Sequence, residues 1–251
     1  MEIDFYNWML VFVRVGAFLL ALPFFSAVNF PIMMRIALAA LMISPQLPAF
    51  SVTHLDFFSL IGLMFREVSI GLLLGFMARI IFYAVDIAGI VIAAELGLSM
   101  GQIFDPASRQ AEQVPGLMLS LLAILTMLTL DLHHGLLLGF AKTFEVLPLG
   151  GGHLSPSLFE LVVGRTAQIF SVALQIAAPV MAVSFVISVF FAILSRAVPQ
   201  MNVFAESFGI RIAGGLIVFG FTLQITAQYV ANHLRRIPED LMYIGQLLNG
   251  G

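Results

Sequence analysis

Residues 57–100 have the sequence FFSLIGLMFREVSIGLLLGFMARIIFYAVDIAGIVIAAELGLSM, and this stretch decides the fold. Its 44 positions are mostly apolar and include no proline. One helix of that length, at about 1.5 Å per residue, would reach about 66 Å, roughly twice the apolar core of a bilayer. We therefore expect an all-α protein in which this stretch is a bent helix or a helical hairpin.

Apolar segments of similar character lie on both sides of this stretch. They cover residues 8–25, 32–43, 117–140, 158–198 and 208–230, and residues 117–140 are the cleanest candidate for a single span. Residues 158–198 are again too long for one simple span, and Pro179 should kink or break a helix there. The chain is therefore expected to be one helical, membrane-associated domain over residues 1–251.

Two helix boundaries can be predicted from local sequence. Pro156 suits the first turn of a helix, and Ser157 followed by Glu160 fits a capping box. At the other end of the chain, Arg235 and Arg236 followed by Pro238 predict a helix C-terminus.

Composition places the protein in or against a membrane. Hydrophobic residues make up 61% of its 251 residues, charged residues only 10%, and the mean hydropathy is +1.06. So few charges cannot cover the surface of a soluble domain of this size. The 11 basic residues are scattered and the net charge is -3, which excludes a nucleic-acid partner, and cysteine is absent, which excludes disulfides and thiolate sites. The acidic start, Met1-Glu2-Ile3-Asp4, is unlike a removable signal peptide.

Charged residues inside the apolar segments are the first candidate functional feature. A charge facing lipid costs about 2.5 to 3.5 kcal/mol, so charges in these segments should pair inside an assembly or lie at an interface. The candidates for buried pairing are Arg66, Glu67, Arg79 and Asp86. Arg79 and Asp86 are seven residues apart and share one helical face, which suits either a structural ion pair or the site of a proton-coupled transporter.

Small residues predict close helix packing. Gly71 and Gly75 form a GxxxG pair, and Ala93, Gly97 and Gly101 continue the small-residue pattern at four-residue spacing. Such faces let two helices approach closely, and they are common in membrane proteins of every function.

Catalytic and metal motifs receive little support. Residues 97–101 match the GxSxG nucleophile elbow, but the residues before them fit a helix where the motif needs a strand, so a serine hydrolase is a remote alternative. Asp131, His133 and His134 suggest a metal cluster, yet adjacent histidines on a helix point about 100° apart. We therefore predict no catalytic residue, no cofactor and no metal site.

Two motifs carry a resemblance to a known family. The stretch GLSMGQIFDPAS at residues 97–108 resembles the FliR family of flagellar export proteins, called SctT in virulence type III secretion systems. A second motif, which includes Arg196, Pro199, Gln200 and Phe204, is similar to the pattern that opens the last helical unit of that family. The chain length and the order of apolar segments agree with the family from end to end.

The resemblance implies an integral membrane protein of the export gate, built of kinked helical hairpins. It implies assembly with FliP-type and FliQ-type subunits, contact with an FlhB-type switch protein, and passage of unfolded export substrates through the gate. The location implied is the bacterial inner membrane, within the flagellar basal body, in contact with membrane lipid. The alternative that the residues leave open is a polytopic secondary transporter that uses the Arg79/Asp86 face.

The resemblance also implies a pore plug in the loop at residues 104–115. Its polar residues lie between two apolar segments, and irregular backbone at membrane depth must be buried in protein or line a water-filled cavity. Apolar side chains on the entry side would suit a hydrophobic constriction, and an ordinary surface loop is the alternative. The residues expected to form the plug and constriction are Met100, Ile103, Phe104, Asp105, Pro106, Gln113, Val114 and Pro115.

Overall fold

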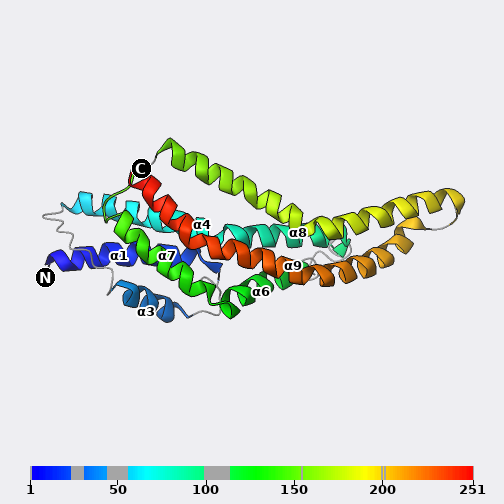
Figure 1. Ribbon diagram of the computed structural model, residues 1–251, viewed down its shortest axis with the longest axis horizontal. Coiled ribbons are helices and arrows are strands. Elements are labelled where there is room, and N and C mark those ends of the chain that lie inside the picture. The colour runs from blue at the N-terminus through cyan, green and yellow to red at the C-terminus, as the bar shows by residue number, and fades with distance from the viewer. Residues whose placement is uncertain are drawn as a thin grey trace. The chain divides into compact units, whose positions relative to one another are not determined.

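The computed structural model describes residues 2–23, 31–43, 56–98, 114–153, 155–198, 200 and 202–250, and every regular element in these ranges is a helix (Figure 1). The helices are α1 (Glu2–Ala21), α3 (Ile32–Ile43), α4 (Phe57–Glu95), α6 (Val114–Thr129), α7 (Leu132–Val146), α8 (Pro156–Ala197) and α9 (Val203–Leu248). The prediction of an all-α fold is confirmed.

The chain forms two compact units. The first consists of residues 1–80, 131–166 and 233–251, and the second consists of residues 81–130 and 167–232. The three longest helices, α4, α8 and α9, each contribute one part to each unit. Each unit therefore has a core of its own, in which helices distant in the sequence pack together.

The core of the first unit is built on aromatic side chains and close helix contact. Phe18 of α1 stacks on Phe140 of α7 with ring centroids 3.9 Å apart. An ideal Cβ placed on Gly71 would lie 2.9 Å from the Cβ of Ala17, and one on Gly75 would lie 2.9 Å from the carbonyl oxygen of Phe18. The GxxxG pair therefore allows α4 to approach α1 closely, as its sequence predicted.

The core of the second unit is built around the later half of α4. Val85, Ala88, Ala93 and Leu96 are almost fully buried there. A Cβ on Gly89 would lie 2.7 Å from the backbone nitrogen of Gly116, so α4 and the start of α6 meet with no side chain between them. Small residues set this contact as they do in the first unit.

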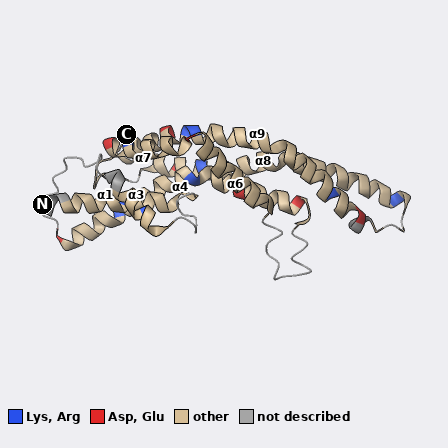
Figure 2. Cartoon of the chain, turned by 90° about the horizontal axis from the view of Figure 1, so that it is seen from below, with Lys and Arg blue, Asp and Glu red and all other residues tan. Residues whose placement is uncertain are grey.

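Within the described residues, three helices are long and apolar enough to cross a membrane, namely Phe57–Glu95, Pro156–Ala197 and Glu206–Leu248. The bent pair α6 and α7 would add a fourth if it acts as one span. Much of the apolar surface of α8 and α9 stays exposed, and Figure 2 shows long stretches of both helices without charge. Such surface needs lipid or other protein to cover it.

Several predicted boundaries are wrong. The two overlong stretches are continuous helices of 39 and 42 residues, so neither is a hairpin, and the alternative of one long bent helix stays open. Helix α8 continues across Pro179, which excludes a break there and leaves the expected kink as a prediction. The supposed clean span 117–140 is interrupted between α6 and α7, at Leu130 and Asp131, and Asp131 has a left-handed backbone with φ of 52°. The helix cap is Ser155 rather than Ser157, because the Ser155 hydroxyl accepts a hydrogen bond from the Leu158 N–H at 3.2 Å.

The predicted helix end at Arg235–Pro238 is also wrong, because α9 continues to Leu248. A proline removes one backbone donor and crowds the preceding turn, which a helix survives when packing compensates. Leu241, Ile244 and Leu248 are at most 3% exposed and continue a buried helical face beyond Pro238. Burial of these side chains outweighs the local cost of the proline.

Candidate functional site

The last turn of α4, from which the predicted plug loop leaves, is held firmly within the second unit. The hydroxyl of Ser184 on α8 donates a hydrogen bond to the carbonyl oxygen of Glu95 at 3.1 Å. Leu96 is fully buried, and a Cβ on Gly215 of α9 would overlap its side chain. The last turn of α4 is therefore packed against both α8 and α9.

Gly97 ends this turn in a conformation that favours glycine. Its φ is +77°, in the left-handed region that other residues adopt at a cost of about 1–2 kcal/mol. A Cβ there would also lie 2.8 Å from the ring of Phe208. Backbone conformation and space both require the glycine of the GLS motif, so this part of the motif has a structural role in starting the loop.

The other end of the loop is the first turn of α6. Val114 begins α6 and is 48% exposed, whereas Pro115 is buried. The hydroxyl of Ser120, on the next turn, donates a hydrogen bond to the carboxylate of Asp86 on α4. Of the predicted plug residues, Met100, Ile103, Phe104, Asp105, Pro106 and Gln113 lie outside the described residues. Both ends of the loop are thus anchored in the same unit.

The buried charges of the first unit form a network that sequence reasoning only partly anticipated. Arg14 of α1 and Glu67 of α4 form an ion pair in which both side chains are 0% exposed. Glu67 also accepts a hydrogen bond from the backbone N–H of Gly150 at 2.8 Å. Arg14 donates to the carbonyl of Leu147 at 2.9 Å, and its guanidinium lies 4.6 Å from the centroid of the Phe144 ring. The buried guanidinium of Arg14 and the buried carboxylate of Glu67 thus each have hydrogen-bond partners, which offset the free-energy cost of removing the two charges from water.

Arg66 extends the same network to the connection between α7 and α8. It donates to the carbonyl oxygen of Gly150 at 2.7 Å and to that of Gly152. Gly150 and Gly152 have φ of +70° and +102°, so the connection turns in a way that points its carbonyls at α4. Adjacent residues of α4, Arg66 and Glu67, therefore hold the α7–α8 connection through its backbone.

Arg79 and Asp86 each have partners of their own. Arg79 donates to the carbonyl oxygen of Ala21 at 3.3 Å in the first unit, and Asp86 accepts from Ser120 in the second. The coupling of Arg79 to Asp86 stays a prediction. Sequence reasoning missed Arg14 as the partner of Glu67, although its place in an apolar segment was the available signal, because sequence spacing cannot pair charges on different helices.

The second motif lies at the connection between α8 and α9. Arg196 is in the last turn of α8 and Gln200 follows it, and both side chains are exposed. Phe204 is in the first turn of α9, although its side chain lies outside the described part, as does Pro199. The motif therefore marks a connection between two long helices.

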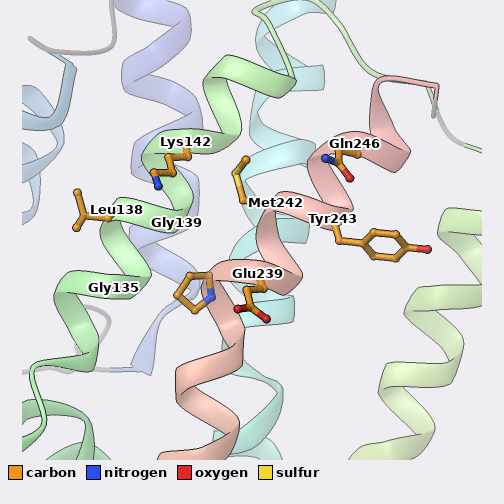
Figure 3. A pocket seen from close by; sticks show the side chains of 9 residues that line it. Gly135, Leu138, Gly139, Lys142, Glu239, Met242, Tyr243 and Gln246 are labelled. Atoms are coloured by element: carbon orange, nitrogen blue, oxygen red, sulfur yellow. The ribbon is translucent and has the colours of Figure 1, made fainter.

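A cavity of about 470 Å³ lies between α7 and the end of α9 in the first unit (Figure 3). Its polar lining includes Lys142 on α7 and Glu239 and Gln246 on α9. One cation and one anion leave this lining without net charge, so an ionic ligand is not favoured. Gly139 and Pro238 also line this cavity, and a Cβ on Gly139 would lie 2.7 Å from the Cα of Pro238, so the glycine of α7 makes room for the proline of α9.

The break before α7 brings together residues that the sequence argument had separated. One ligand atom from each of Asp131, His133 and His134 lies within 4.8 Å of the others. The 100° divergence expected of adjacent helical residues does not keep the two imidazoles apart, because their ring centroids are 4.1 Å apart. This arrangement could hold a metal ion, contrary to the geometric argument made from the sequence.

Comparison with known proteins agrees with the family suggested by the motifs. The family model described as "Bacterial export proteins, family 1" matches residues 5–237. The chain is 30% identical to "Flagellar biosynthetic protein FliR" of Escherichia coli (strain K12) over 230 residues, which cover 90% of this chain and 87% of that protein. It is 29% identical to the protein of the same name from Bacillus subtilis (strain 168) and 26% identical to that of Aquifex aeolicus (strain VF5). Each of these two matches covers 90% of this chain and 89% of the relative. An all-helical chain with apolar helices long enough to span a membrane, matched over nearly its whole length, belongs to the FliR family, family 1 of the bacterial export proteins.

Proposed function

We propose that this protein is a pore-forming core subunit of the flagellar type III protein export gate, in the bacterial inner membrane at the flagellar basal body. It would assemble with FliP-type and FliQ-type subunits, contact an FlhB-type switch protein and pass unfolded export substrates across the membrane. The match to bacterial export proteins over residues 5–237 is the observation that carries this proposal, together with relatives named as flagellar biosynthetic proteins.

The exposed apolar surface of α8 and α9 supports a subunit role. Phe170, Phe185, Phe190 and Phe221 are each at least 58% exposed in this chain. Large apolar side chains on long helices need lipid or partner helices around them. A hetero-oligomeric gate within the membrane supplies both.

The anchored ends of the loop support the plug assignment. The last turn of α4 is fixed by Ser184 and Gly215, and the start of α6 is fixed at Gly89 and by the hydrogen bond from Ser120 to Asp86. A loop whose ends are fixed can close a pore without an independent fold, and a ring of apolar side chains resists wetting. We propose residues 104–115 as the plug, of which Val114 and Pro115 belong to the first turn of α6, with Met100, Ile103 and Phe104 at the constriction.

The experiment that tests this function removes the chain from a flagellated bacterium that makes it. We expect loss of flagellin from the culture medium and loss of swimming, with both restored by the unaltered gene. An affinity tag on the chain should co-purify FliP-type and FliQ-type subunits in fixed proportion. Normal flagellin export in the deletion strain, or recovery of the isolated chain as a stable carrier of a small solute, would contradict the proposal.

A further inference from the structure

We propose that Asp131, His133 and His134 form a binding site for a divalent transition-metal ion, with Zn²⁺ as the expected ion, at the break between α6 and α7. The ligand atoms of these three residues lie within 4.8 Å of one another.

The local backbone explains how three neighbouring residues converge. Asp131 has a left-handed φ of 52° and directly precedes α7, so the chain reverses its twist at the residue before the helix. The backbone N–H of His134 donates to the carbonyl of Asp131 at 3.1 Å, which closes the first turn. This places the Asp131 carboxylate oxygen 3.8 Å from Nδ1 of His134.

The two imidazoles complete the site. The rings of His133 and His134 have centroids 4.1 Å apart and are inclined by 35°. Nδ1 of His133 is shielded from solvent and has no hydrogen-bond partner among the described residues. An imidazole nitrogen without a hydrogen-bond partner can offer its lone pair to a metal ion.

The chemistry of the ligands selects the class of ion. Two imidazoles and one carboxylate suit zinc and its neighbours, whereas Mg²⁺ and Ca²⁺ need more oxygen ligands than one carboxylate offers. Three protein ligands leave at least one coordination position open for water. The side chains of Asp131 and His134 are 79% and 68% exposed, so an ion can reach the site from solution.

Electrostatics limits the affinity. The N-terminus of α7 carries a partial positive charge that opposes a cation, and the Asp131 carboxylate offsets it. A bound ion would cross-link Asp131 to the first turn of α7 and so fix the geometry of the break.

The test uses the full chain, purified in detergent and stripped of metal with a chelator. Titration with Co²⁺, followed by its visible absorption and competed with Zn²⁺, should give one ion per chain. Asp131→Asn removes the carboxylate charge but keeps a residue that tolerates a left-handed backbone, and His134→Gln removes one imidazole. Each should weaken Co²⁺ binding at least about tenfold, as loss of a metal-site residue generally does.

A matched control and a second readout keep the outcome clear. His153→Gln removes an exposed histidine outside the cluster and should leave binding unchanged. Zn²⁺ should raise the thermal midpoint of the unaltered chain and not that of Asp131→Asn, while the helical circular dichroism of the two is the same. Equal Co²⁺ binding by the unaltered chain and both variants, or an equal loss in the control, would overturn the metal site and leave the export function untouched.

Discussion

The guanidinium of Arg14 and the carboxylate of Glu67 form a fully buried ion pair that joins α1 to α4. The pair also binds the connection between α7 and α8, through the carbonyl of Leu147 and the N–H of Gly150. One pair of charges thus fixes three parts of the first unit that lie far apart in the sequence.

Removing one partner of this pair should be severe. We expect Arg14→Ala or Glu67→Ala to destabilise the protein by about 3–5 kcal/mol, because each leaves a buried charge without compensation. The double substitution of Arg14 by Met and Glu67 by Leu should be milder than either, since apolar residues need no partner. The measurement is the thermal midpoint and yield of the assembled complex in detergent.

The half-exposed pair Arg165–Asp240, with an N–O distance of 2.6 Å, provides the control. Arg165→Ala should cost much less, because a solvated pair typically contributes no more than about 1 kcal/mol. Similar losses at Arg14 and Arg165 would show that burial does not set the importance of the first pair.

Gly97→Ala should impair the start of the plug loop. The left-handed φ alone costs about 1–2 kcal/mol for a residue with a Cβ, and the ring of Phe208 occupies the space. A double variant, Gly97→Ala with Phe208→Ala, should relieve the overlap of the new Cβ with the Phe208 ring but not the strain of the left-handed backbone. Gly209→Ala is the control, because no described atom lies within 4 Å of a Cβ at that helical position. The measurement is the yield of assembled complex. Equal yields for Gly97→Ala and Gly209→Ala would contradict this account.

Gly139→Ala should separate α7 from the end of α9. The added Cβ would lie 2.7 Å from the Cα of Pro238, a backbone atom that cannot rotate away, and overpacking of this kind costs about 1–3 kcal/mol. At Gly135, one turn earlier, the Cβ would lie 3.7 Å from the Pro238 ring, which is an ordinary contact. A thermal midpoint lowered by Gly135→Ala as much as by Gly139→Ala would contradict this packing.

Arg79→Ala and Asp86→Ala should each lower the yield of assembled complex. Either change removes one partner of a part-buried hydrogen bond, at a cost of about 1–3 kcal/mol. If the two are coupled, the double substitution will be milder than the sum of the single ones. Strictly additive losses in the double-mutant cycle would show that Arg79 and Asp86 act separately, through Ala21 and Ser120 respectively.

Sequence predicted the features that depend on local composition. The apolar helices, the tight approach at Gly71 and Gly75 and the proline in the first turn of α8 all follow from residue type and spacing. The family followed from two short motifs. Each of these rests on physics that acts within a few residues of chain.

Features that depend on tertiary packing could not be predicted in the same way. The local sequence around Pro238 predicted a helix end. The helix continues there because Gly139, on another helix, leaves room for the proline, and local sequence cannot show that contact. Arg14 and Glu67 are 53 residues apart, and no periodicity links them. The cluster of Asp131, His133 and His134 was named from the sequence but set aside, because the 100° step between adjacent helical residues does not fix where two long side chains end.

The most direct test of the central claim is the permeability of a gate whose plug is shortened. In cells that express the complete gate, deletion of residues 106–113 should leave assembly intact and make the inner membrane leak small solutes, seen as conductance or growth sensitivity. Phe104→Ala should give a weaker leak of the same kind, because it thins an apolar constriction without removing the loop. An assembled deletion complex that stays as tight as the unaltered one would contradict the plug, and would make residues 104–115 an ordinary connecting loop.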